Sequence, residues 1–340
     1  MKTFPWSRIP ARIVPLIAAG ALAAIAVSCG KPAAESATAR QGRLNIAVIP
    51  KGTTHVFWKT VEAGALKAGE ELNVGIKWVG PTKEDDRAQQ IQVVETQVLN
   101  RMDGIVLAPL DADALRRPVE EAVNKTVPVL IFDSALNDAD DLIVSFVATD
   151  NFQGGHIAGH QLGELLRGTG KVILLRYMEG SASTHNREEG FLDAIKEFSG
   201  IEVISAEQYG GATTAAAQQA SEILLLRCRD GDSLAADGIF CPNESTTYGM
   251  LQALRRNRLA GKVKFVGFDS SDPLVEGLQA GEIQGLVLQN PFRMGYLGVK
   301  TMVAHLNGEP VEKRIDTGVD FLTRDNINTP EMQAILNPSL

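Results

Sequence analysis

The sequence predicts an α/β fold of two lobes, each a doubly wound parallel sheet, joined by a hinge that the chain crosses more than once. Beyond residue 43, short runs rich in Val, Ile and Leu alternate with helical patterns of about fifteen residues, and repeated strand-helix units imply parallel sheets with right-handed crossovers. The runs fall into two sets of about five. Roughly 300 residues suit two domains of ordinary size, each able to bury a full core.

The predicted strands are short apolar runs of the kind that is buried on both faces of a parallel sheet. The first, residues 44–49, ends at Pro50 and Gly52, which stop it before it could become a helix. The rest of the first set is residues 74–79, 104–108, 128–132 and 142–148. The second set is residues 171–176, 202–207, 238–241, 263–268 and 285–289. Helical patterns such as residues 85–99 lie between them, so each step extends a parallel sheet.

The two lobes are expected to meet at a tight hinge near residues 149–151, because no stretch rich in Pro, Gly or Ser separates the two sets. A further helix over residues 292–306 and a strand over residues 316–322 cannot form a domain alone, so they must return to the lobes already built. The expected first lobe is residues 43–148 with 290–315, and the expected second lobe is residues 149–289 with 316–330.

Residues 1–28 have the pattern of an export signal, with three basic residues before an apolar run at 13–27 that is too short to span a membrane. The segment ends in Ala-Val-Ser before Cys29 and resembles a lipobox, although Ala26 stands where such boxes usually have Leu. We therefore expect Cys29 to be the lipidated mature N-terminus and residues 29–42 to form a flexible tether. An ordinary cleaved signal peptide is the alternative. The protein is thus expected in the periplasm or on the outer face of the cell membrane.

Charge and cysteine content exclude several functions. The chain has 33 Lys and Arg against 41 Asp and Glu, and the leader holds three of the basic residues, so the acidic surplus argues against nucleic-acid binding. Cys228 and Cys241 could form a disulfide in an exported protein, or remain two small buried thiols. Neither has a Cys-x-x-Cys partner, so zinc or redox chemistry is not expected.

The loops that follow the predicted strands are polar, with aromatic residues among them. Ligands bind at this edge of a doubly wound sheet. The residues in these loops are Lys51, Phe57, Trp58, Asp111, Asp133, Asp150, Asn151, Tyr209, Asn243, Glu244, Asp269, Gln289 and Asn290. They are spread over both lobes, which suits a rim closing on a ligand with many hydroxyls better than a catalytic centre. Each Asp or Asn could instead be only a helix cap or turn residue, and one of the two aromatics is expected to face the core.

Known catalytic and cofactor patterns are missing from the chain, including the glycine-rich dinucleotide and phosphate loops and the serine-hydrolase and zinc-protease motifs. His156 and His160 are four residues apart, but no third ligand lies nearby in sequence, so a solvated helix face is the simpler interpretation. We therefore expect no enzyme activity, no cofactor and no metal site.

Seven segments appear in the order found in one family. They are Ile46-Ala47-Val48-Ile49 with Phe57-Trp58, residues 104–109, residues 128–133, Thr149-Asp150-Asn151, residues 187–191, Asn243-Glu244 and residues 266–270. Over residues 43–324 the chain resembles the type I periplasmic sugar-binding proteins of the ribose-binding branch, which serve ABC importers.

The resemblance implies that Phe57 and Trp58 stack on a sugar ring, with Tyr209 as a second-lobe aromatic. It also implies that sugar hydroxyls are bound by Asp133, Arg187, Asn243, Asp269 and Gln289. The chain departs from the ribose binders at Lys51, His55, Ala108 and Ser134, all in the first lobe. We count Lys51, His55 and Ser134 among the ligand-binding residues, but ribose itself is not carried over. Another pentose or hexose, a sugar acid paired with Lys51, or a cyclic polyol remains admissible.

The function implied is that of a lipid-anchored, monomeric receptor that closes on a monosaccharide and delivers it to the permease and ATPase subunits of an ABC importer. Closure is expected about the crossings near Asn151, Asn290 and Asp316, driven by a ligand that touches both lobes. The alternatives are a sensory receptor of the same fold and a non-sugar ligand such as a nucleoside or a furanosyl signal. A sugar-responsive repressor is disfavoured because an export signal stands where a DNA-binding segment would lie.

Overall fold

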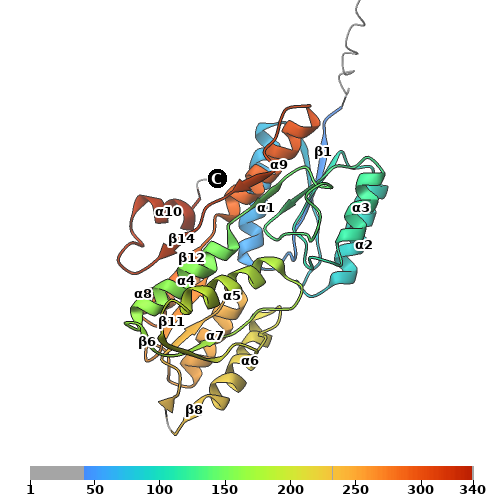
Figure 1. Ribbon diagram of the computed structural model, residues 1–340. Coiled ribbons are helices and arrows are strands. Elements are labelled where there is room, and N and C mark those ends of the chain that lie inside the picture. The colour runs from blue at the N-terminus through green and yellow to red at the C-terminus, as the bar shows by residue number, and fades with distance from the viewer. Residues whose placement is uncertain (1–41, 232, 339–340) are drawn as a thin grey trace, which may run out of the picture. The chain divides into compact units, whose positions relative to one another are not determined.

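The computed structural model describes residues 42–231 and 233–338. Within residues 43–338 it contains two six-stranded sheets, each covered by helices on both faces (Figure 1). We call the elements built on the first sheet the first lobe and those built on the second sheet the second lobe. The predicted class, two parallel-sheet lobes joined by a hinge of several crossings, is confirmed. The predicted leader, Cys29 and most of the tether lie outside the described residues.

The first sheet is entirely parallel and has the order β13-β5-β4-β3-β1-β2. Its strands are β1 (Asn45–Ile49), β2 (Gly75–Trp78), β3 (Gly104–Leu107), β4 (Val129–Phe132), β5 (Phe146–Ala148) and β13 (Arg314–Asp316). Helices α1 (Val56–Glu71) and α9 (Pro291–Leu306) contribute to the core on one face, and α2 (Arg87–Leu99) and α3 (Arg116–Asn124) to the core on the other.

The second sheet has the order β14-β12-β11-β10-β6-β7, and only β14 is antiparallel to its neighbour. Its strands are β6 (Thr169–Leu174), β7 (Gly200–Ser205), β10 (Gly238–Phe240), β11 (Lys264–Phe268), β12 (Gly285–Leu288) and β14 (Asp320–Leu322). Helices α4 (Asn151–Leu165) and α5 (Ala182–Ile195) cover one face. Helices α6 (Thr214–Arg227), α7 (Glu244–Arg256), α8 (Asp272–Ala280) and α10 (Pro330–Leu336) contribute to the core on the other.

Each lobe contains a pair of helices that pack closely because glycines face each other's backbone. A Cβ at Gly64 of α1 would overlap the Phe292 carbonyl of α9, and a Cβ at Gly155 of α4 would overlap the Arg187 carbonyl of α5. The second contact matters for function, because it fixes α5, and with it Arg187, against the start of α4.

The strand expected over residues 316–322 is in fact two strands, β13 in the first sheet and β14 in the second. Gly318 lies between them with a φ of +89°, a conformation that glycine adopts easily, and the chain passes from one lobe to the other at this turn. With the passages from β5 to α4 and from β12 to α9, the chain crosses between the lobes three times. A two-stranded ladder of β8 (Arg229–Asp230) and β9 (Ser233–Leu234) was not expected.

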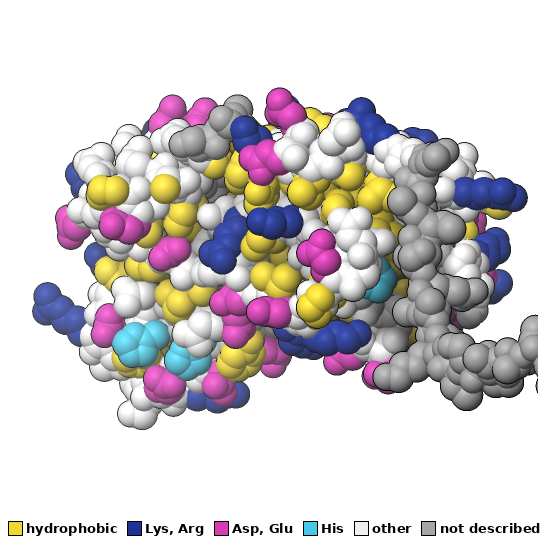
Figure 2. Space-filling model, turned by 90° about the horizontal axis from the view of Figure 1, so that it is seen from above, with side chains coloured by type: hydrophobic (Ala, Val, Ile, Leu, Met, Phe, Trp, Pro, Cys, Tyr) yellow, Lys and Arg dark blue, Asp and Glu magenta, His cyan; other side chains and the backbone are white. Residues whose placement is uncertain are grey.

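Cys228 and Cys241 are free thiols in the structure, and both contact the same apolar core of the second lobe. Over residues 42–338 apart from 232, no helix is both long and apolar enough to cross a membrane. Acidic and basic side chains are interspersed on the face drawn in Figure 2.

Candidate binding site between the two lobes

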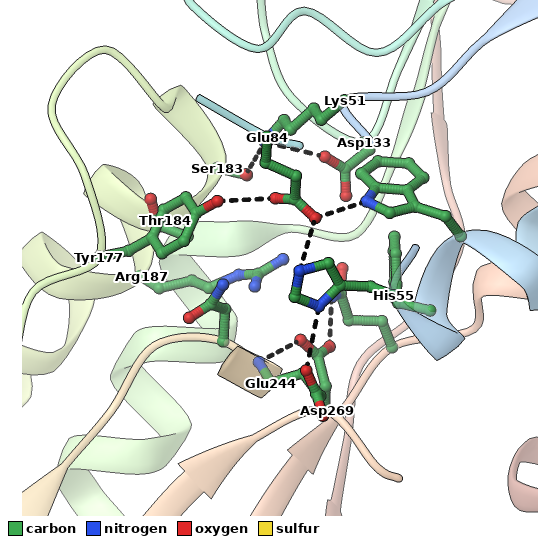
Figure 3. Close-up of a pocket in the computed structure, with 14 residues that line it drawn as sticks. Lys51, His55, Glu84, Asp133, Tyr177, Ser183, Thr184, Arg187, Glu244 and Asp269 are labelled. Carbon is green, nitrogen blue, oxygen red and sulfur yellow. Dashed lines mark hydrogen bonds and ion pairs between the residues drawn. The ribbon is translucent and has the colours of Figure 1, made fainter. Parts of the chain in front are cut away.

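A small cavity lies where the carboxyl ends of the two sheets face each other (Figure 3). The first lobe contributes Lys51, His55, Phe57, Trp58, Glu84 and Asp133, and the second contributes Tyr177, Ser183, Thr184, Arg187, Asn243, Glu244, Asp269 and Gln289.

Two equivalent turns place a carboxylate at the cavity from each lobe. Asp133-Ser134 follows Phe132, the last residue of β4, and Asp269-Ser270 follows Phe268, the last residue of β11. Both aspartates have a left-handed backbone, with φ of +61° and +68°, and each backbone N–H donates to the carbonyl of the neighbouring strand. Such a conformation is uncommon for a residue other than glycine and is often found at functional sites.

Lys51, directly after β1, joins the two lobes at one end of the cavity. Its Nζ lies 3.1 Å from Asp133 Oδ2 and donates to Ser183 Oγ at 2.8 Å and Ser181 Oγ at 3.3 Å. The side chain is only 5% exposed, so the ion pair and the two hydroxyls compensate the charge that burial would otherwise penalise. The positive charge of Lys51 is therefore balanced by protein groups before any ligand binds.

His55, which precedes α1, makes a second connection between the lobes. Its Nδ1 lies 3.1 Å from Glu244 Oε2 and its Nε2 lies 3.8 Å from Glu84 Oε1. Burial alone would lower the pKa of His55, but the hydrogen bond to Glu244 and the charges of Glu84, Glu244 and Asp269 outweigh it and raise that pKa to about 9. The imidazole is therefore a cation at neutral pH.

The aromatic pair at the start of α1 divides its roles as expected. Trp58 is 2% exposed and packs edge-to-face against Phe132, with ring centroids 6.1 Å apart. Phe57 remains half-buried at the cavity, with its ring centroid 4.8 Å from that of Trp58 and the two rings nearly perpendicular. The indole Nε1 donates to Glu84 Oε1 at 2.7 Å. Trp58 is thus mainly a buried wall, and Phe57 offers the more accessible face.

Arg187 is held inside the second lobe by several partners. Its Nε donates to Asn151 Oδ1 at 2.8 Å, one terminal nitrogen donates to the Pro242 carbonyl at 3.0 Å, and the guanidinium lies 3.9 Å from the centre of the Phe268 ring. Burial lowers the pKa of Arg187, while the charges of Asp269 and Asp133 oppose that effect. The guanidinium is thus a preorganised donor fork with capacity left for a ligand.

Asp269 and Gln289 form the opposite side of the cavity. Asp269 Oδ2 accepts from the backbone N–H of Glu244 at 3.0 Å, and Gln289 Nε2 donates to Asp269 Oδ1 at 2.5 Å. Burial raises the pKa of Asp269 to about 6 against the opposing influence of Arg187, Gln289 and that N–H. Within the described part of the chain, Gln289 Oε1 is buried without a hydrogen-bond partner. A buried acceptor of this kind calls for a donor such as a ligand hydroxyl.

All but two of the residues predicted to bind ligand line this cavity. Ser134 is buried nearby instead, where its hydroxyl accepts from the Ser183 backbone N–H at 3.1 Å. Tyr209 is 39% exposed and lines a different pocket. It follows β7, the edge strand of the second sheet, and pairs with Arg176 in an isolated bridge. Its side chain lines a pocket with Met178, Glu179 and Ser181 and is not among the residues that line the cavity.

Several lining residues were not predicted to bind ligand. They are Glu84, Tyr177, Ser183, Thr184 and Glu244. Glu244 was noted only as a polar residue after a strand. Tyr177 could have been found by the same rule, since it follows β6. Glu84, six residues past β2, carried no signal, because a charged residue in a surface-type loop gives no indication of where the loop folds.

No cluster of three or more His, Cys, Asp or Glu side chains suited to a metal ion occurs among the described residues. His156 and His160 instead approach Glu197 and Glu164 at the helix surface.

Comparison with known proteins identifies the family. A model of the periplasmic binding protein domain matches residues 46–310. The ribose import binding protein of Haemophilus influenzae is 29% identical over 298 residues, which is 88% of this chain and 97% of that protein. The D-allose-binding periplasmic protein of Escherichia coli is 27% identical over 289 residues, which is 83% of this chain and 90% of that one.

Solved structures agree. A carbohydrate transporter solute binding protein from Agrobacterium radiobacter, in complex with D-arabinose, has a TM-score of 0.82 and 34% identity, covering 87% of this chain and 100% of its own. An ABC transporter solute binding protein from Agrobacterium vitis with bound D-fucose has a TM-score of 0.81 and 35% identity, covering 86% of this chain and 99% of its own.

Proposed function

This chain belongs to the periplasmic binding protein family, and on that premise we propose that it captures a neutral monosaccharide between its two lobes for an ABC importer. The matched proteins are binding proteins of importers and not enzymes. The family places the protein in the periplasm. The closed form then presents the sugar to the permease, while the ATPase subunits drive transport.

The observation that carries this proposal is the composition of the cavity. Four carboxylates line it, from Glu84, Asp133, Glu244 and Asp269, together with Lys51, Arg187 and His55. Carboxylates and amides accept from and donate to hydroxyls, and an aromatic side chain can cover the C–H face of a sugar ring. Both lobes contribute, so a polyhydroxylated ring between them would hold the cleft closed.

A neutral sugar fits this charge distribution better than a sugar acid. Lys51 is already paired with Asp133, and His55 with Glu244. A ligand carboxylate would therefore add a negative charge to a cavity whose acidic groups already outnumber its basic groups. Relatives are named for ribose, D-allose, D-arabinose and D-fucose, all neutral monosaccharides, and we place the ligand of this chain in that class.

We further propose that Cys29 carries a lipid that anchors the chain, that the mature protein works as a monomer, and that closure pivots at the three passages between the lobes. Residues 43–148 with 290–315 would then move against residues 149–289 with 316–330. The sequence before residue 43 supports the anchor, and the course of the chain between the sheets supports the hinge.

A thermal-shift screen tests the function. The panel contains D-ribose, D-arabinose, D-allose and D-fucose, with uronic acids, polyols and nucleosides as competitors. A ligand that binds only the folded state, at a concentration 100 times its Kd, adds about 2.7 kcal/mol of stability. We expect one or more neutral monosaccharides to raise the Tm by several degrees. Stabilisation by nucleosides or uronic acids alone would reject the proposal.

A further inference from the structure

Glu84 lies at the centre of a contact between the lobes that the family resemblance did not indicate. Its Oε1 accepts from Trp58 Nε1 of the first lobe at 2.7 Å, and its Oε2 accepts from the Tyr177 hydroxyl of the second lobe at 2.7 Å (Figure 3). Burial and the charge of Glu84 hold the pKa of Tyr177 well above its usual value, so the phenol stays protonated and donates. Glu84 therefore connects an aromatic wall from each lobe.

The loop that carries Glu84 is held firmly in place. Thr53 and Thr54 donate to the carbonyls of Pro81 and Thr82, and Asp86 caps α2. The loop folds so closely over the end of β1 that a Cβ at Gly52 would come within 2.8 Å of Glu84 Cγ. A side chain fixed in this way is preorganised, and it cannot move far to suit different ligands.

We propose that Glu84, with its partner Tyr177, determines which monosaccharide allows the cleft to close, an inference that rests on the sugar-binding function proposed above. A carboxylate has about four acceptor positions, and Trp58 and Tyr177 occupy two of them. Glu84 thus keeps capacity for ligand hydroxyls while it bridges the lobes. A sugar that fits beside this bridge closes the cleft with every group paired. A sugar with a bulkier substituent at this end separates the two residues and leaves a buried carboxylate short of a donor.

Leaving a buried polar group unpaired is the usual way in which such sites reject near-identical ligands. The Glu84–Tyr177 bond exists only when the lobes are together, so the selection acts on closure and not on the first encounter. A bond of the same chemistry outside the cavity provides a control, because Tyr296 Oη donates to Glu71 Oε2 at 2.6 Å at an exposed position.

Calorimetric titration with D-ribose, D-arabinose, D-allose and D-fucose tests the inference in wild type, Glu84→Gln, Tyr177→Phe and the double variant. We expect each single variant to bind the preferred sugar about tenfold or more weakly than the wild type does. The dissociation constants of the other sugars should change less than about threefold, so that the ratio of affinities between the preferred sugar and the others becomes smaller. The double variant should resemble the single variants. Glu71→Gln and Tyr296→Phe should leave all four dissociation constants unchanged.

Equal weakening of every sugar, or no change at all, would overturn the inference, because Glu84 would then be only a support for Trp58. If a single sugar binds the wild type, a second should begin to bind Tyr177→Phe, and its failure to do so counts against the proposal. If none of the four binds the wild type, the sugar-binding function itself fails.

Discussion

The two lobes place the same tripeptide, Phe-Asp-Ser, at the ends of equivalent strands, yet the two aspartates have different surroundings. Asp133 of the first lobe forms an ion pair with Lys51, which also donates to Ser181 and Ser183 across the cleft. Asp269 accepts from Gln289 and from the backbone of Glu244, both in its own lobe. One turn thus contributes to closure, and the other to a fixed frame.

The same contrast extends to other residues of the two walls. In the first lobe, Lys51, His55 and Glu84 each bond to a side chain of the opposite lobe. In the second lobe, Arg187 donates hydrogen bonds to Asn151 and to the Pro242 carbonyl, and the side chain of Asn243 caps α7. Two of the cross-cleft residues, Lys51 and His55, are also positions where the chain departs from the ribose binders. In the function proposed above, Arg187 and Asn243 would therefore act as a fixed template, whereas Lys51, His55 and Glu84 would take part in closure through their partners in the second lobe.

The largest expected effect comes from removing the side chain of Arg187, which is held in place inside the second lobe. Arg187→Ala should lower the free energy of unfolding by about 3–5 kcal/mol and abolish measurable sugar binding, because it leaves buried partners and Asp269 uncompensated. Denaturant unfolding and calorimetry measure the two effects. Arg314→Ala is the control, since Arg314 also lies over an aromatic ring but is exposed, and it should cost less than about 1 kcal/mol. Similar losses in the two variants would refute the idea of a rigid second-lobe frame.

Lys51→Met should have a smaller effect, about 2–3 kcal/mol in unfolding free energy, because it leaves Asp133 as a buried charge without its cation. We expect the double variant Lys51→Met/Asp133→Asn to recover at least half of that loss, and neither variant to restore the contact with Ser183. Chemical denaturation of the four proteins completes the cycle. If the two losses simply add, the ion pair contributes nothing to this wall.

Stability should depend on pH through His55 of the first lobe at the basic end and through Asp269 of the second lobe at the acidic end. The pKa of His55 is raised to about 9, so the stability it contributes is fully present below pH 6.5 and is lost as the pH rises through 9. We expect a loss of about 2–3 kcal/mol over that interval, absent in His55→Gln. It can be followed by denaturant unfolding at fixed ionic strength. A wild-type protein that is as stable at pH 10 as at pH 7, relative to the variant, would contradict the contact with Glu244.

Asp269 of the second wall titrates at the acidic end. Its pKa is raised to about 6, so the folded state binds this proton more tightly than the unfolded chain and gains relative stability as the pH falls below 6. Sugar affinity should change in the opposite direction, because a protonated Asp269 loses an acceptor. Affinity measured by calorimetry should therefore be highest between about pH 6 and 9. An affinity unchanged at pH 5 would remove Asp269 from the ligand contacts.

The smallest effect is expected at Asn243, whose side chain accepts from the Thr246 backbone N–H at 3.2 Å. Asn243→Ala should cost about 1 kcal/mol of stability, whereas Asn243→Ser should keep the cap and cost only a few tenths. If Asn243→Ser binds sugar as the wild type does, the residue belongs to the frame alone. Weaker binding at unchanged stability would instead establish it as a ligand contact.

The sequence predicted most of the cavity because one rule applies to both sheets. Parallel strands end at one edge, so residues just after them, such as Lys51, Asp133 and Asp269, must gather there. The rule failed for Tyr209 because it says nothing about how far an edge-strand loop reaches. It also missed Glu84, whose position depends on a loop folding back over β1 with Gly52 beneath it.

By itself the sequence determined the fold class and the family, because alternating apolar runs and turn residues act locally, over a few residues at a time. It also supplied the polar side chains of the cavity and the aromatic pair that lines it. Only the tertiary structure decided which of these bond within a lobe and which bond across the cleft. Those contacts join residues up to 189 positions apart, and their formation depends on the angle at which the two lobes meet, which no local pattern encodes.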